Sequence, residues 1–200
     1  MGLAQSKLLT PEEYLAFERA SETRHEYFDG QLYAMAGESP NHSRICVNLA
    51  GEIRAQLKGR PCEAFSPNMK VRNGAFSKFA YPDLTVVCGP PVFHDESQDV
   101  LVNAKVIFEV LSPSTEAYDR GRKFLRYQSI GTFTDYVLIS QDEPWIEHRI
   151  LRPDGQWTML SVTGLEHSLH LASIDCTLRL TEVYDRVTFP VPGDDAEVAI

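Results

Sequence analysis

The chain has 200 residues, of which 43% are hydrophobic and 24% charged, the composition of one ordinary globular domain and too short for two full ones. Its formal net charge is −9, from 19 Lys and Arg against 28 Asp and Glu. This balance argues against a protein that holds nucleic acid over a broad non-specific surface, because phosphate binding is driven by cations.

The first predicted elements are a helix and a β-hairpin. Thr10 is an N-cap, proline follows at the first helical position, and Glu13 completes a capping box. A short helix should therefore begin at residue 11. Asp29-Gly30 then separates two runs of strand composition, which predicts a hairpin over residues 24–36.

A longer helix is predicted to begin at Ser39-Pro40 and to end before Gly59 and Pro61. Apolar residues recur in it every four positions, as expected for a helix with one buried face. These residues are Ile45, Leu49, Ile53 and Leu57. His42 lies on the same stripe, so its side chain should face inward near the hairpin.

The rest of the chain is predicted to be mostly strands, with one helix at about 115–130 that Ser114 or Thr115 caps. The predicted strands are 62–72, 83–87, 105–111, 133–140, 144–151 and 156–162. Residues 180–187 suit a last short helix or strand. Together these elements predict an α/β (α+β) fold. We expect one domain over residues 10–189, after an N-terminal extension (1–9) and before a disordered acidic tail (190–200).

The compartment is predicted from cysteine usage and from the N-terminus. Cysteines 46, 62, 88 and 176 are far apart and include no Cys-x-x-Cys pair, which favours reduced, mostly buried thiols over disulfides or a zinc knuckle. Residues 1–10 lack the pattern of a signal peptide. The apolar runs are too short for a membrane span, which needs roughly 20 residues. We expect a cytoplasmic protein with no membrane partner.

Two acidic residues stand beside or inside apolar strands. Asp83 begins one such run, and Glu109 lies within Val106–Leu111, 26 residues later. A buried carboxylate is costly unless it is paired, hydrogen-bonded or bound to a metal. Adjacent strands would present both carboxylates to a hard cation, and this predicts a site for Mg²⁺ or Mn²⁺.

These motifs resemble those of a known family. The chain is similar to the Uma-type restriction endonuclease family of the PD-(D/E)XK nuclease superfamily over about residues 8–187. The resemblance rests on Tyr81-Pro82-Asp83-Leu84, on Phe108 to Thr115, on His25 to Gly30, on Ser39 to His42, and on Asp119 to Lys123 followed by Tyr127. It implies a mixed β-sheet core flanked by helices. It also implies Mg²⁺-dependent hydrolysis of DNA phosphodiester bonds, and a homodimer.

The superfamily pattern expects a lysine two residues after the second acid, where this chain has Leu111. The resemblance implies that the lysine has moved to the next helix, at Lys123. Asp119 and Tyr127 lie four residues before and after it, on the same helical face. A lysine there could orient the attacking water, lower its pKa, or stabilise the pentacovalent phosphate.

The resemblance adds Glu26 as a third carboxylate of the metal site, either as a direct ligand or through a metal-bound water. Three converging acids repel one another unless a cation lies between them. His42 is expected to support these ligands without touching the metal. Arg120, Arg122 and Arg126 lie in the densest positive run of the chain, which predicts a surface that contacts DNA phosphates.

Structural explanations compete with each of these assignments. Asp83 could simply precede a strand, and Asp119 with Lys123 could be an ordinary surface ion pair. The leading functional hypothesis is an endonuclease. One alternative is a protein with a nuclease fold that has lost cleavage activity and serves to bind nucleic acid or protein; the acidic net charge and the displaced lysine favour it. Another is a phosphodiesterase that acts on a small molecule or RNA.

Overall fold

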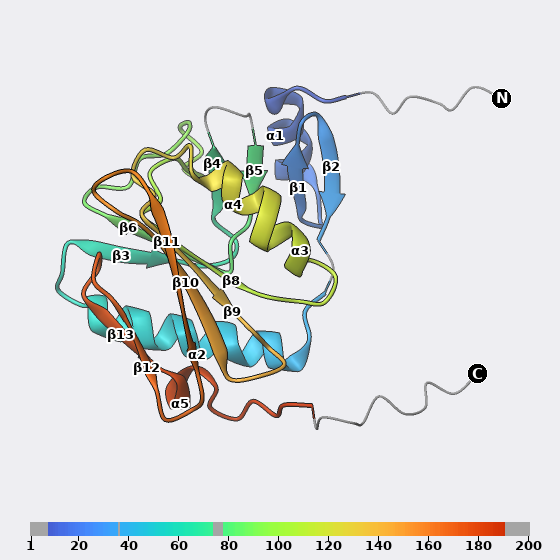
Figure 1. Cartoon of the computed structure of the whole chain (residues 1–200). Coiled ribbons are helices and arrows are strands. Elements are labelled where there is room, and N and C mark those ends of the chain that lie inside the picture. Colours follow the sequence, from blue (N-terminus) through green and yellow to red (C-terminus); the bar gives the residue numbers. More distant parts are fainter. Residues whose placement is uncertain (1–7, 36, 74–77, 191–200) are drawn as a thin grey trace, which may run out of the picture.

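The computed structural model describes residues 8–35, 37–73 and 78–190 (Figure 1). The helices are α1 (Pro11–Ala20), α2 (Pro40–Leu57), α3 (Glu116–Tyr118), α4 (Phe124–Tyr127) and α5 (Leu180–Val183). A π-helical turn, Asp119–Lys123, joins α3 to α4. No helix within the described ranges is long and apolar enough to cross a membrane.

The larger sheet has six strands in the order β11-β10-β9-β8-β6-β3. Its strands are β3 (Cys62–Phe65), β6 (Leu84–Cys88), β8 (Val106–Val110), β9 (Asp135–Ile139), β10 (Trp145–Leu151) and β11 (Trp157–Thr163). β8 pairs with β9 in parallel and with β6 in antiparallel fashion. The sheet is therefore mixed, as predicted.

The second sheet has five short strands in the order β2-β1-β5-β4-β7. They are β1 (His25–Phe28), β2 (Gln31–Ala34), β4 (Lys70–Asn73), β5 (Lys78–Ala80) and β7 (Val100–Leu101), and a separate ribbon is formed by β12 (Ser168–Leu171) and β13 (Cys176–Arg179). β1 and β2 form the predicted hairpin. Asp29 and Gly30 have φ values of 49° and 88°, the left-handed conformation that a two-residue turn with the twist of a hairpin requires.

The capping box of α1 is present. The side chain of Thr10 accepts a hydrogen bond from the backbone N–H of Glu13, and the Glu13 carboxylate accepts one from the N–H of Thr10. Tyr14 and Leu15 of this helix pack with Tyr27 and Phe79. α1 is thereby attached to the five-stranded sheet.

Each face of the six-stranded sheet is covered by a different group of elements. α2 lies along one face (Figure 1), where its predicted apolar stripe packs against alternate residues of the central strands, such as Val106, Phe108 and Val110. Ile107 of the same strand packs on the other side, with α4. Because side chains alternate along a strand, Glu109 faces the α4 side with Ile107.

The structure corrects the prediction for residues 62–72. This segment is two strands, β3 and β4, and they belong to different sheets. Residues 66–69 form the turn between them, with the N–H of Met69 donating to the carbonyl of Ser66. The short strands β5 and β7 were not predicted. Runs of two or three residues carry too little periodicity to be recognised as strands.

The prediction of four reduced cysteines is wrong for two of them. Cys62 and Cys88 are joined by a disulfide, while Cys46 and Cys176 are free thiols. The two bonded residues are 26 positions apart, but β3 pairs with β6 so that Cys62 lies directly opposite Cys88. Sheet register, which sequence spacing does not reveal, brings them together.

Asp99 connects α1 to the five-stranded sheet. Its carboxylate lies 2.7 Å from the Arg19 guanidinium and 2.9 Å from the Lys70 ammonium. These cations, Arg19 first, lower the pKa of Asp99 to about 2. Asp99 is therefore a charged partner for both elements at neutral pH.

A carboxyl group whose pKa is lower in the folded than in the unfolded protein stabilises the fold at pH values above the unfolded-state pKa. This stabilisation is lost as the pH falls through the folded-state pKa. We expect Asp99→Asn to cost up to about 1 kcal/mol at pH 7, since the pair is partly exposed. The difference from wild type should shrink between about pH 4 and pH 2. Urea unfolding at several pH values measures it, and a difference that is independent of pH would contradict the assignment.

Candidate active site

The segment after β8 turns three predicted site residues toward the sheet. Asp119 and Lys123 stand at the two ends of the π-helical turn, and both side chains are buried. Tyr127, at the end of α4, is buried as well. A π-helical turn is rare and occurs often at functional sites. The sequence predicted one continuous helix here and missed this irregularity.

The ammonium of Lys123 lies among three carboxylates. Its Nζ is 2.9 Å from Glu109 Oε1, 3.2 Å from Glu26 Oε1 and 3.4 Å from Asp119 Oδ1. Only 8% of the Lys123 side chain is exposed to solvent. The hairpin, the central strand and the helical segment therefore meet at one buried cation.

Asp83 joins this group from the neighbouring strand. It lies immediately before β6, which pairs with β8 so that Leu84 is opposite Phe108. The backbone N–H of Val110 donates to Asp83 Oδ2 at 2.6 Å. This hydrogen bond holds the carboxylate next to the residue that follows Glu109. The two acids, 26 residues apart in sequence, are thus neighbours at the paired ends of two strands.

The charges of the site are unevenly balanced. Burial raises the pKa of Glu109, Lys123 opposes this rise, and the nearby carboxylates of Asp119, Asp83 and Glu26 add to it. Burial by itself lowers the pKa of Lys123, but Glu109 and Glu26 raise it well above its usual value. Glu109 and Glu26 therefore favour the charged form of Lys123, and the carboxyl groups of the site outnumber its one ammonium.

The donor atoms suit a hard divalent cation, since Glu26, Asp83 and Glu109 offer carboxylate oxygens only. Excess negative charge at the site would also be relieved by such an ion. In the part of the chain that is described, however, these three acids do not form a group whose ligand atoms all lie within 4.8 Å of one another. The ammonium of Lys123 stands between Glu26 and Glu109.

Hydrogen bonds from neighbouring groups orient the acids. The hydroxyl of Tyr127 donates to Glu109 Oε1 at 3.0 Å, and the backbone N–H of Tyr81 donates to Glu26 Oε1 at 3.2 Å. The Tyr81 hydroxyl in turn donates to the buried carboxylate of Glu18 at 2.7 Å. Sequence reasoning missed Tyr81 and Glu18, because a contact between residues 63 positions apart leaves no local pattern.

The His42 side chain is largely buried, as its position on the apolar stripe of α2 predicted. Its Nε2 is 3.5 Å from Asp83 Oδ2, and 15% of its side chain is exposed. On the other side, Nδ1 lies 3.0 Å from Glu38 Oε2. His42 thus contacts one of the predicted metal ligands.

The three arginines of the basic run lie in different environments. Arg120 pairs with Glu116 and with Glu147 of β10, at 2.7 Å each. Arg126 lies over the ring of Phe28. Arg122 is exposed. Arg120 and Arg126 therefore have structural partners, and the contact of all three with DNA stays a prediction.

Comparison with known proteins identifies the family. The sequence matches Uma2, described as "Putative restriction endonuclease", over residues 11–181. The chain belongs to the Uma2 family. Two proteins of Synechocystis sp., both described as uncharacterized, are 37% identical over 181 residues and 33% identical over 164 residues. The first comparison covers 90% of this chain and 94% of the relative, and the second covers 82% and 93%.

The fold of this Uma2 chain is also found in a crystal structure. A protein from Anabaena variabilis, described as "a putative nuclease belonging to DUF820", superposes with a TM-score of 0.73 at 19% identity, over 88% of this chain and 97% of that one. The predicted fold class, a mixed sheet flanked by helices with an N-terminal helix and hairpin, is therefore confirmed.

Proposed function

We propose that this Uma2 protein is a metal-dependent endonuclease that hydrolyses DNA phosphodiester bonds. The observation that carries the proposal is the position of the Lys123 ammonium, which contacts Glu26 and Glu109 beside Asp83. A buried cluster of this kind is costly to maintain. Clusters of strongly interacting ionisable groups are typical of functional sites.

Asp83 and Glu109, with Glu26 as a third ligand, would hold Mg²⁺ or Mn²⁺. When bound, such a cation neutralises charge on the phosphate and lowers the pKa of a coordinated water. Binding relieves the repulsion among the acids that surround Glu109.

The chain's own groups perform the remaining tasks. Lys123 Nζ supplies a fixed positive charge to the phosphate and a hydrogen-bond donor to the attacking water. Tyr127 keeps the Glu109 carboxylate in place through its hydroxyl, and the Val110 N–H does the same for Asp83. Preorganised groups of this kind need little rearrangement during the reaction.

The proposed contact with DNA phosphates rests mainly on the exposed Arg122, with Arg120 and Arg126 in the same basic run. Lys123 itself is buried and serves the reaction centre. A homodimer would supply two such sites for the two strands of a duplex. Size-exclusion chromatography with light scattering measures this oligomeric state.

The test is cleavage of supercoiled plasmid with Mg²⁺ or Mn²⁺. Asp83→Asn keeps an oxygen that can accept the Val110 N–H but removes the negative charge. We expect a loss of at least about 100-fold in cleavage rate, because metal binding is weakened and the reacting phosphate loses its counter-charge. Asp142→Asn, at an exposed position after β9, is the matched control and should cut like wild type.

Equal cleavage by wild type and Asp83→Asn would overturn the assignment. If wild type cuts no DNA or RNA but binds DNA, the protein is a binding module with a nuclease fold. Cleavage of RNA or of a small phosphodiester, with DNA left intact, would reassign the substrate. Thermal unfolding of each variant verifies that a lost activity does not reflect a lost fold.

A further inference from the structure

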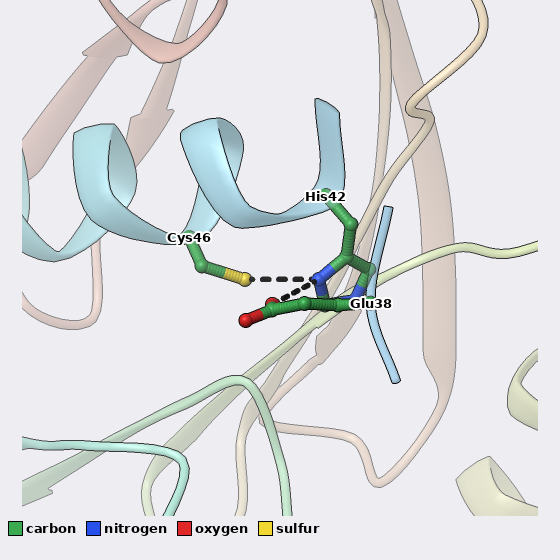
Figure 2. A group of neighbouring side chains, drawn as sticks. All are labelled: Glu38, His42 and Cys46. Carbon is green, nitrogen blue, oxygen red and sulfur yellow. Dashed lines mark hydrogen bonds and ion pairs between the residues drawn. The ribbon is translucent and has the colours of Figure 1, made fainter. Parts of the chain in front are cut away.

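A second group of potential metal ligands lies beside the candidate active site. Glu38 precedes α2, and His42 and Cys46 follow on successive turns of it, so the three side chains gather on one side of the helix (Figure 2). His42 Nδ1 lies 3.0 Å from Glu38 Oε2 and 3.5 Å from Cys46 Sγ. Within the described residues, the ligand atoms of this group all lie within 4.8 Å of one another.

These separations are close to those around a tetrahedral zinc ion. Bond lengths of about 2.3 Å to sulfur and about 2.0–2.1 Å to nitrogen and oxygen place an imidazole nitrogen about 3.6 Å from a thiolate and about 3.4 Å from a carboxylate oxygen. The observed contacts of 3.5 Å and 3.0 Å differ from these values by a few tenths of an ångström. Small side-chain rotations would admit an ion.

An independent contact supports the same conclusion. His42 has its Nδ1 toward Glu38 and Cys46, while its Nε2 lies 3.5 Å from Asp83 Oδ2. A histidine that binds a metal through one ring nitrogen usually donates its other N–H to a carboxylate, which fixes the tautomer and the ring orientation. Asp83 is in the position of that carboxylate.

The accessibility of the group also suits an exchangeable ion. The side chain of Glu38 is 55% exposed and that of His42 is 15% exposed, so solvent reaches the group from the Glu38 side. Three protein ligands leave the fourth tetrahedral position for water or substrate.

We propose that Glu38, His42 and Cys46 bind a divalent cation of the zinc type, at a site separate from the oxygen-only site proposed at Asp83 and Glu109. Sulfur and nitrogen ligands select Zn²⁺ over Mg²⁺. Asp83 orients the His42 ring and thereby connects the two sites. In the absence of the ion, His42 Nδ1 is hydrogen-bonded to the Glu38 carboxylate, and its Nε2 lies 3.5 Å from Asp83 Oδ2.

The experiment uses Co²⁺ as a spectroscopic probe for Zn²⁺, added to the full chain after treatment with a chelator. We expect one Co²⁺ per chain to give thiolate-to-cobalt charge-transfer absorption, which Zn²⁺ abolishes by displacement; Co²⁺ bound by carboxylates alone gives no such absorption. Cys46→Ser should lose this absorption, whereas Cys176→Ser, which removes the other free thiol, should keep it. His42→Ala should weaken Co²⁺ binding, and Asp83→Asn should weaken it by about 10–100-fold through the loss of His42 orientation.

Two results would overturn the proposal: no thiolate absorption in the wild-type complex, or the same absorption in Cys46→Ser. Glu109→Gln separates this site from the proposed nuclease. It should abolish Mg²⁺-dependent cleavage and leave the cobalt spectrum unchanged. A wild-type protein that gives the spectrum but never cuts nucleic acid would contradict the proposed function alone.

Discussion

Lys123→Met is expected to abolish cleavage and to lower the free energy of unfolding by about 3–5 kcal/mol, the usual cost of removing one partner from a buried ion pair. The methionine has a similar length but no charge, so Glu26, Glu109 and Asp119 would lose the cation that all three contact. Urea unfolding measures the change in stability, and plasmid cleavage measures the change in activity.

The control is Arg122→Met, which removes a positive charge from an exposed position one residue earlier. Its stability should change by at most about 0.5 kcal/mol. A double-mutant cycle identifies the cause of the loss. Because Glu109→Gln removes one of the unpaired charges, Lys123→Met should cost less in that background, by about 0.5–3 kcal/mol. Costs that simply add would mean that the two residues do not interact.

Leu49→Ala is expected to cost about 2–5 kcal/mol of unfolding free energy without a direct effect on the chemistry. Leu49 is 0% exposed and lies in the middle of the α2 stripe, against the central strands of the six-stranded sheet. Deleting its branched end leaves a cavity that a helix and a sheet cannot easily close. Thermal or urea unfolding gives the value.

Val47→Ala is the matched control on the same helix, because its side chain is 69% exposed. It should change stability by less than about 0.5 kcal/mol. A loss below about 1 kcal/mol for Leu49→Ala would contradict the packing of α2 against the sheet. Cleavage by the folded fraction of Leu49→Ala should remain, since Leu49 is a core residue of the α2 stripe and not one of the proposed metal ligands.

Local sequence patterns were sufficient to predict the first helix, the hairpin and the long helix. The capping box predicted the start of α1, Asp29-Gly30 predicted the hairpin, and the four-residue apolar repeat predicted α2. Each depends on residues within one or two turns of each other, so the sequence alone carries the information. Glu109 could likewise be recognised from its immediate neighbours, because a charged residue within an apolar strand is costly to bury without a partner.

The π-helical turn and the division of 62–72 into two strands depend on tertiary packing. A regular helix and a π-helical turn can have the same composition, and packing against the sheet decides between them. The disulfide between Cys62 and Cys88 depends on the register of β3 with β6. Register follows from which faces are buried, and sequence spacing does not encode it.

The sequence by itself determined which residues this protein has available for chemistry and which elements carry them. They are the acids Glu26, Asp83 and Glu109, and a lysine, Lys123, in the helical segment that follows the strand of Glu109. Only the tertiary structure decided that Lys123 lies between two of those acids and that His42 stands between Asp83 and the Glu38–Cys46 pair. The physical reason is that strand pairing and helix packing unite segments from distant parts of the chain, and local residue patterns do not record such long-range contacts.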